Sequence, residues 1–98
     1  MVEMMPGFPT TFLIIAAGNG HLDVVKALLK NKAAVDKPDY FNATALMAAA
    51  ASGHQEVVAY LLANGASAKA KDKDGKDVLA SAKEGGNPEV LKLIQAKL

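Results

Sequence analysis

The chain has 98 residues, enough for one small domain with its own core and too few for two. Hydrophobic residues make up 51% of the sequence and charged residues 21%, a composition typical of a globular domain and not of a disordered chain. A formal net charge of +1 offers no electrostatic basis for binding nucleic acid or an anionic membrane, and the absence of cysteine excludes disulfides, thiolate metal sites and cysteine nucleophiles.

The first residues, 1–6, lack the basic and long apolar regions of a signal peptide. No apolar run reaches the roughly 20 residues that a membrane-spanning helix needs. The lack of cysteine also fits a reducing compartment. We therefore expect a cytoplasmic protein that does not contact a membrane.

The sequence repeats itself with a period of 33 residues. When residues 11–36 are aligned with residues 44–69, 12 of the 26 positions are identical. A weaker third copy continues in the same register, with Leu79 and Val90 at the positions of Leu46 and Val57. A shared period of this length is the mark of a protein built from stacked structural repeats. The identical residues are mostly apolar, glycine or helix-capping: Thr11, Leu13, Ala16, Ala17, Gly20, His21, Val24, Val25, Leu28, Leu29, Asn31 and Ala33.

Each copy is predicted to form two short helices joined by a tight turn. The first helix follows a residue whose side-chain oxygen can cap it: Thr11, Thr44 or Asp77. It ends before a glycine that can adopt a positive φ: Gly20, Gly53 or Gly86. The second helix has apolar residues at i, i+1, i+4 and i+5, which lie on one face. Polar links at residues 35–44 and 68–77 carry turn signals.

Residues 44–54, Thr-Ala-Leu-Met-Ala-Ala-Ala-Ala-Ser-Gly-His, resemble the first-helix signature of the ankyrin repeat, Thr-Pro-Leu-His-x-Ala-Ala-x-x-Gly-His. Residues 57–66 resemble the second-helix pattern, and residues 72–75 match the turn that opens a repeat. The resemblance covers about residues 6–98. It implies an all-α fold: a single domain over 1–98, an ankyrin-type stack of helix–turn–helix repeats (an α-solenoid) with short hairpin-like turns. The units lie at about 6–38, 39–71 and 72–98.

The two ends of the stack are predicted to differ. Lys83 and Gln95 replace Ala50 and Leu62 of the second unit, as in a terminal repeat with a polar outer face. The other end is apolar and needs a cover. It could be covered by further repeats of a longer array, by a fold-back of residues 1–10, or by a second copy of the chain. Candidates for that self-association are Met4, Met5, Phe12 and Ile14. These departures fit a natural domain, a fragment or an engineered scaffold.

Another departure concerns Lys32, which takes the position of Gly65. If the backbone there is left-handed, a residue with a Cβ costs on the order of 1 kcal/mol.

No arrangement of residues points to catalysis, a metal or a cofactor, so we expect a protein that is not an enzyme and has no small-molecule substrate. His21 and His54 lie one repeat apart, which places them about 10 Å from each other, too far to share a metal ion. Both match the glycine–histidine turn of the repeat and are expected to be structural. The carboxylates of residues 72–77 lack the later ligands of a calcium loop.

The resemblance implies a protein–protein interaction module, a scaffold or adaptor, that binds its partner on a concave surface of turn tips and first helices. Tyr40 and Phe41 at a turn tip are the strongest candidates, since exposed aromatic residues commonly anchor interfaces. Alternatively, one of the two rings folds under the turn. A self-associating structural protein is the second functional hypothesis. The predicted contact residues are Phe8, Ile15, Tyr40, Phe41, Ala48, Ser52, Lys73 and Lys76.

Overall fold

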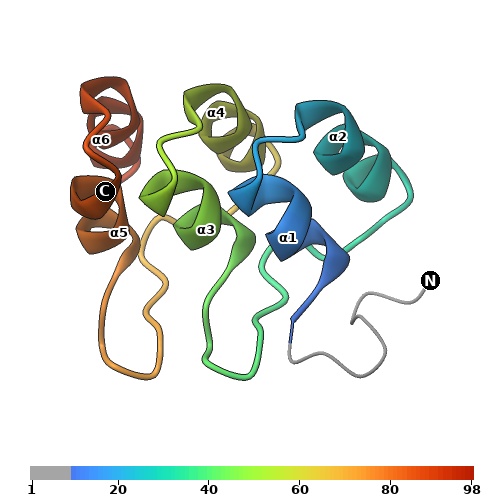
Figure 1. The fold of residues 1–98 in the computed structure, drawn as a ribbon, viewed down its shortest axis with the longest axis horizontal. Helices are drawn as coiled ribbons and strands as arrows, with labels where there is room; N and C mark the ends of the chain where they lie inside the picture. Colours follow the sequence, from blue (N-terminus) through green and yellow to red (C-terminus); the bar gives the residue numbers. More distant parts are fainter. Residues whose placement is uncertain (1–9) are drawn as a thin grey trace.

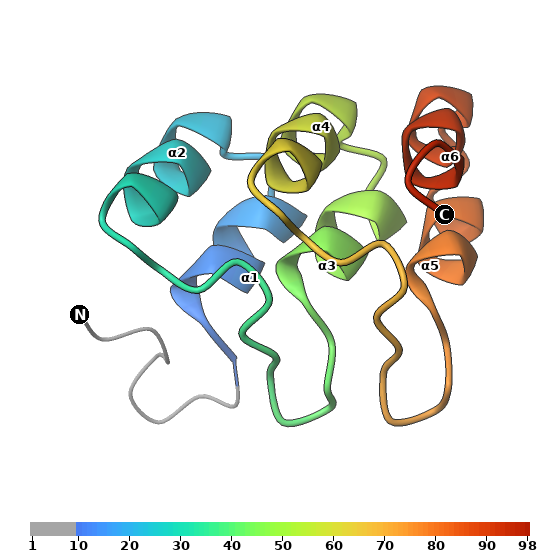
Figure 2. The same cartoon turned by 180° about the vertical axis from the view of Figure 1, so that it is seen from behind.

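The computed structural model of the chain describes residues 10–98, and its only regular elements in that range are helices. The helices form three consecutive pairs that stack in one direction (Figures 1 and 2). The all-α repeat stack expected from the sequence is confirmed. The six helices within this range are α1 (Phe12–Gly18), α2 (Leu22–Lys30), α3 (Ala45–Ala51), α4 (Gln55–Ala63), α5 (Val78–Gly85) and α6 (Pro88–Gln95).

The predicted caps start the first helix of each pair. Thr11 Oγ1 accepts a hydrogen bond from the backbone N–H of Ile14 at 3.0 Å, and Asp77 Oδ1 accepts one from Ala80 at 2.9 Å. Thr44 does the same for α3. These bonds satisfy an N–H that the first turn of a helix leaves without a partner. The glycines predicted to end or follow these helices have a left-handed backbone: Gly20, Gly53 and Gly86.

The helices form two layers. The first helices, α1, α3 and α5, lie side by side in one row, and the second helices, α2, α4 and α6, form the other (Figures 1 and 2). The core lies between neighbouring pairs and is centred on the middle pair, whose alanines in α3 let the first helices approach closely. Its members in the middle pair are Ala45, Leu46, Met47, Ala49, Ala50, Val57, Val58, Leu61 and Leu62.

Equivalent positions in the three pairs show which faces the stack leaves open. Val24 of α2 is 45% exposed, whereas Val57 at the same position of α4 is 1% exposed. Phe12 is likewise exposed where Ala45 is buried. At the opposite end, Lys83 and Gln95 are exposed. The stack therefore has an apolar end, formed by Phe12, Val24 and half-buried Leu28, and a polar end at α5 and α6, as the sequence predicted.

Lys32 and Asn42 are the non-glycine residues of the described chain with a positive φ, 70° and 61° respectively. Lys32 follows α2 at the position that Gly65 occupies after α4, where φ is 88°. We expect Lys32→Gly to raise the free energy of unfolding by about 1 kcal/mol, because glycine adopts this conformation without steric strain. Urea denaturation followed by circular dichroism measures the change.

The reverse substitution and a second site serve as controls for this prediction. Gly65→Lys should lower the free energy of unfolding by a similar amount. No atom lies within 4 Å of a Cβ built there, so backbone strain is the sole cost. Asn42→Gly should give no gain, because the Asn42 side chain donates a hydrogen bond to the carbonyl of Lys71. An equal change in the free energy of unfolding for Lys32→Gly and Asn42→Gly would contradict the assignment of backbone strain to Lys32.

Candidate protein-binding surface

Two hairpin tips, residues 39–43 and 72–76, extend from the first helices on the side away from the second helices (Figures 1 and 2). An aspartate shapes each of them. Asp39 Oδ1 accepts hydrogen bonds from the backbone N–H groups of Phe41 at 2.8 Å and Ala43 at 2.9 Å. The N–H of Asp39 in turn donates to the carbonyl of Ala43 at 3.0 Å. The carboxylate therefore fixes the backbone on both sides of Phe41.

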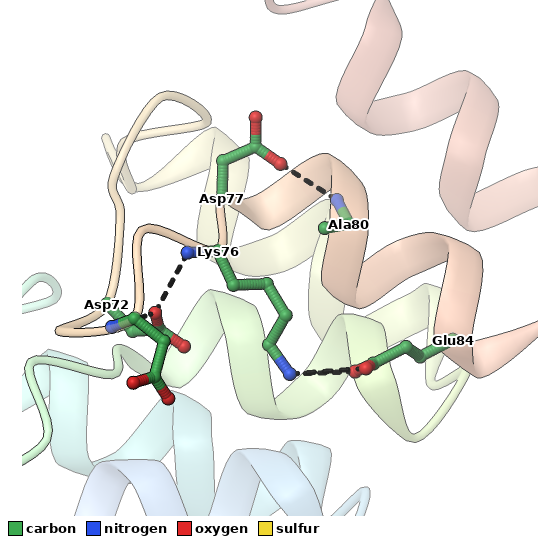
Figure 3. A network of polar contacts seen from close by, with 6 residues as sticks. Asp72, Lys76, Asp77, Ala80 and Glu84 are labelled. Atoms are coloured by element: carbon green, nitrogen blue, oxygen red, sulfur yellow. Dashed lines mark hydrogen bonds and ion pairs between the residues drawn. The ribbon is translucent and has the colours of Figure 1, made fainter.

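The second hairpin tip repeats this arrangement one period later. Asp72 Oδ1 accepts from the N–H groups of Asp74 and Lys76, both at 2.9 Å (Figure 3). The N–H of Asp72 donates to the carbonyl of Lys76, and an isolated antiparallel bridge joins Lys71 to Asp77. The two tips thus have the same fold for the same reason.

Hydrogen bonds hold the two hairpin tips together. The backbone N–H of Lys73 donates to the carbonyl of Phe41 at 3.0 Å, and Asn42 Nδ2 donates to the carbonyl of Lys71 at 2.9 Å. Nearer the helices, Asp36 Oδ1 accepts from the N–H of Ser67 at 3.1 Å. The loop of residues 36–43 is therefore fastened to the loop of residues 67–73 at three points.

The aromatic pair, Tyr40 and Phe41, stands at the first of these tips with both side chains in solvent. Tyr40 is 66% exposed and Phe41 is 65% exposed. The alternative in which one ring folds under the turn is not what the structure shows. A backbone held by Asp39 and Lys73 presents these two rings outward.

The other predicted contact residues divide into three groups. Ile15, Ser52 and Lys73 are exposed, and Ala48 is half-buried on α3. Lys76 is half-buried and engaged with another side chain. Phe8, like the self-association candidates Met4 and Met5, lies outside the described residues.

Two candidates for self-association fall within the described chain, and they differ. Phe12 is exposed at the apolar end of the stack. Ile14 is only 7% exposed and belongs to the core, as does Met47 at the same position of α3. Its side chain therefore leaves almost no surface for a second copy of the chain, because it is already used in packing.

Lys76 and Glu84 join the second hairpin tip to the end of α5 (Figure 3). Lys76 Nζ lies 3.0 Å and 3.2 Å from the two carboxylate oxygens of Glu84. This hydrogen bond and the negative charge of Glu84 raise the pKa of Lys76 above its usual value, and the charges of Asp72 and Asp74 add to the effect. Contact with the protein opposes the shift by removing some water from the ammonium group.

We expect Glu84→Gln to lower the pKa of Lys76 toward its ordinary value, measured by a ¹³C NMR titration of the Lys76 Cε. Since the folded-state pKa is the higher one, the stabilisation that Glu84 confers is fully present below the unfolded-state pKa of about 10.4. It disappears as the pH rises through the raised folded-state value. A stability difference between wild type and variant that persists above that pH would contradict the assignment.

Residues that position the aromatic pair were missed by the sequence analysis. Asn42 is the clearest case, since its left-handed backbone and side-chain bond to the Lys71 carbonyl join the tips. A signal was present, because Asn42 aligns with Gly75 across one period, and asparagine is the residue besides glycine that most readily adopts this conformation. Glu84 carried no comparable signal.

The histidine position of the second repeat packs against the turn of the first. The ring of His54 lies against the turn at Gly20, so that a Cβ at Gly20 would come within 2.9 Å of it. One period later Asn87 takes the same place, and its Nδ2 donates to the carbonyl of Gly53 at 2.9 Å. His54 and Asn87 therefore each lie between one turn and the next. Among residues 10–98, no three histidine, aspartate or glutamate side chains form a group that could hold a metal ion.

Within the same range, none of the helices is both long and apolar enough to cross a membrane.

Comparison with known proteins places this architecture in a family. The family model described as ankyrin repeats (3 copies) matches residues 3–72, which is 70 of the 98 residues. No curated protein matches the chain. Ankyrin repeats generally act as modules for protein–protein interaction and typically have no catalytic function. The sequence period and the helix pairs agree with this match. The chain therefore belongs to the ankyrin repeat family.

Proposed function

We propose that this chain is a non-catalytic scaffold or adaptor module that binds another protein through its hairpin tips and first helices, with Tyr40 and Phe41 as the main contacts. The observation that carries this proposal is the exposure of two adjacent aromatic rings on a loop of fixed backbone. Aromatic side chains of this kind are enriched among the few residues that dominate the energy of an interface.

The rigidity of the first hairpin tip supports the proposal. Binding costs free energy when a loop must be ordered, and a loop that is already ordered avoids that cost. Here Asp39 fixes the tip from within, and Lys73 and Asn42 are part of the bonds that fasten it to the next tip. The backbone that carries the rings is therefore ordered before a partner arrives.

Site-specific crosslinking tests the proposal directly. Phe41 is replaced by the photo-crosslinking amino acid p-benzoylphenylalanine, and Lys83 at the polar end of the stack is replaced in a control chain. We expect one dominant protein adduct at position 41 that is absent at position 83. An excess of unlabelled wild-type chain should suppress formation of this adduct by competition.

A Tyr40→Ser/Phe41→Ser chain should fail to compete, since each lost aromatic contact is worth about 2 kcal/mol of binding free energy. It should still fold, because both rings are exposed in the free protein. Competition by this variant as strong as that by wild type would exclude the aromatic pair as the contact.

A second candidate function, self-association, is favoured by the apolar end of the stack. Phe12 and Val24 are exposed there, whereas the equivalent residues of the second repeat are buried by the preceding helix pair. Light scattering after size exclusion, over about a hundredfold range of concentration, tests this alternative. A dimer that Val24→Lys dissolves would support it, and a monomer at every concentration would reject it.

A further inference from the structure

We infer that the segment recognised by the aromatic pair is an acidic peptide, with an apolar residue that packs on Tyr40 and Phe41 and carboxylates beside it. This inference rests on the proposed function and specifies the chemistry of the partner. It depends on how the charged groups of residues 36–43 and 69–77 are arranged, because their formal charges cancel while their positions do not.

The lysines around the aromatic pair point their charge into solvent. Each is exposed, and the ion pairs of the described chain involve other residues, Lys76 with Glu84 and Lys92 with Glu89. These ammonium groups therefore have no carboxylate partner among residues 10–98, and each can meet one from outside. The four lysines are Lys37, Lys69, Lys71 and Lys73.

The carboxylates of the same loops are mostly engaged by the backbone. Each of four aspartates accepts at least one hydrogen bond from a backbone N–H, which holds the carboxylate against the loop and offsets part of its charge. In these two segments Asp74 is the exception, since its carboxylate accepts no such bond. The four aspartates are Asp36, Asp39, Asp72 and Asp77.

The bonds between the hairpin tips place the backbone of two of these lysines beside the backbone that carries the aromatic pair. Lys73 donates its N–H to the carbonyl of Phe41, and the carbonyl of Lys71 accepts from Asn42. The residue between them, Asp72, turns its Oδ1 inward to the backbone of its own tip (Figure 3). A carboxylate of a bound peptide would therefore meet Lys71 and Lys73 close to the aromatic contact.

Such an arrangement favours a peptide over a nucleic acid. Exposed charge pairs contribute mainly to the rate and specificity of association, so the aromatic contact must supply the affinity. A nucleic acid would need a run of phosphate contacts, whereas the chain as a whole has a net charge of only +1. An apolar residue flanked by acids satisfies both the rings and the two lysines.

Selection from a displayed library of random 12-residue peptides tests the inference. The immobilised full chain is the target, and the Tyr40→Ser/Phe41→Ser chain is used to remove peptides that bind elsewhere. We expect the enriched peptides to share an apolar residue with aspartate or glutamate within a few positions. A consensus without acids, or with basic residues, would overturn this inference and leave the proposed function standing.

Charge reversal gives the quantitative test with a matched control. Lys71→Glu/Lys73→Glu should weaken binding of a selected peptide by roughly tenfold, and added salt should weaken the wild-type complex in the same direction. Lys92→Glu/Lys97→Glu changes the net charge equally but lies near the C-terminus. This variant should leave the affinity for the peptide unchanged. Equal losses in both variants would overturn the inference, because the charge near the rings would then have no special effect.

Two further outcomes distinguish a failure of the proposed function from a failure of the acidic-peptide inference. If no peptide prefers the wild-type chain to the Tyr40→Ser/Phe41→Ser chain, both the proposed function and the acidic-peptide inference are wrong. If a 12-nucleotide single-stranded DNA binds at the aromatic pair as tightly as the selected peptides, the partner is a polyanion, and the acidic-peptide inference alone is wrong. Circular dichroism of every variant shows whether it is folded.

Discussion

Replacing Leu61 with alanine is expected to lower the free energy of unfolding by about 2–5 kcal/mol. Leu61 lies in α4 of the middle repeat, its side chain is fully buried, and helix pairs flank it on both sides. The truncation leaves a cavity that its neighbours cannot fill by relaxing. Because a small domain has a total stability of roughly 5–15 kcal/mol, this loss is a large fraction of the total. Urea denaturation measures the loss.

Leu28 provides the matched control for Leu61. It occupies the same position one period earlier, in α2, but it is only half-buried because it lies at the apolar end of the stack. Leu28→Ala should therefore cost clearly less than Leu61→Ala. If the two substitutions cost the same, the middle repeat does not hold the centre of the core.

The second large effect is expected at Gly85, the last residue of α5. A Cβ at this position would collide with the carbonyl oxygen of Ala50 and lie 3.1 Å from that of Ala51. Both atoms belong to the backbone at the end of α3, so the clash is relieved only if α5 moves away from α3. We expect Gly85→Ala to destabilise the protein by about 1–3 kcal/mol, although alanine is the better helix former.

Gly18, the last residue of α1, is the control, and the expected change in stability there has the opposite sign. A Cβ built there meets only the Cβ of Ala48, at 3.5 Å, which is an ordinary contact. Gly18→Ala should therefore stabilise the protein by about 0.5–1 kcal/mol through helix propensity. Thermal unfolding of both variants checks the pair. Stabilisation of both variants would mean that α5 does not approach α3 as closely as described.

Much of the fold could be predicted because each repeat encodes its own local structure. The caps Thr11, Thr44 and Asp77 act within three residues of themselves, so sequence spacing was sufficient to identify them. The polar end was equally readable, since Lys83 breaks an apolar pattern that its equivalents keep. Strain at Lys32 followed from one alignment with Gly65 and was confirmed by its positive φ.

The candidate surface was predictable in its outline and not in its contacts. Tyr40 and Phe41 stood out because large aromatic residues are unusual at a turn tip. The bonds that hold them depend on groups about 30 residues away, at Lys71 and Lys73, and no local pattern reports such distances. The burial of Ile14 could not be predicted for a similar reason, since it depends on packing against other elements.

The bond between the N–H of Lys73 and the carbonyl of Phe41 makes the aromatic pair thermodynamically linked to the last repeat. Local opening of the last repeat breaks this bond and removes one of the constraints on the first hairpin tip, so a ligand that requires the ordered tip must oppose that opening. If a partner binds at Tyr40 and Phe41 as proposed, it is expected to slow hydrogen exchange at the Lys73 amide and in α5. Hydrogen exchange in the terminal repeat would then report binding at its neighbour.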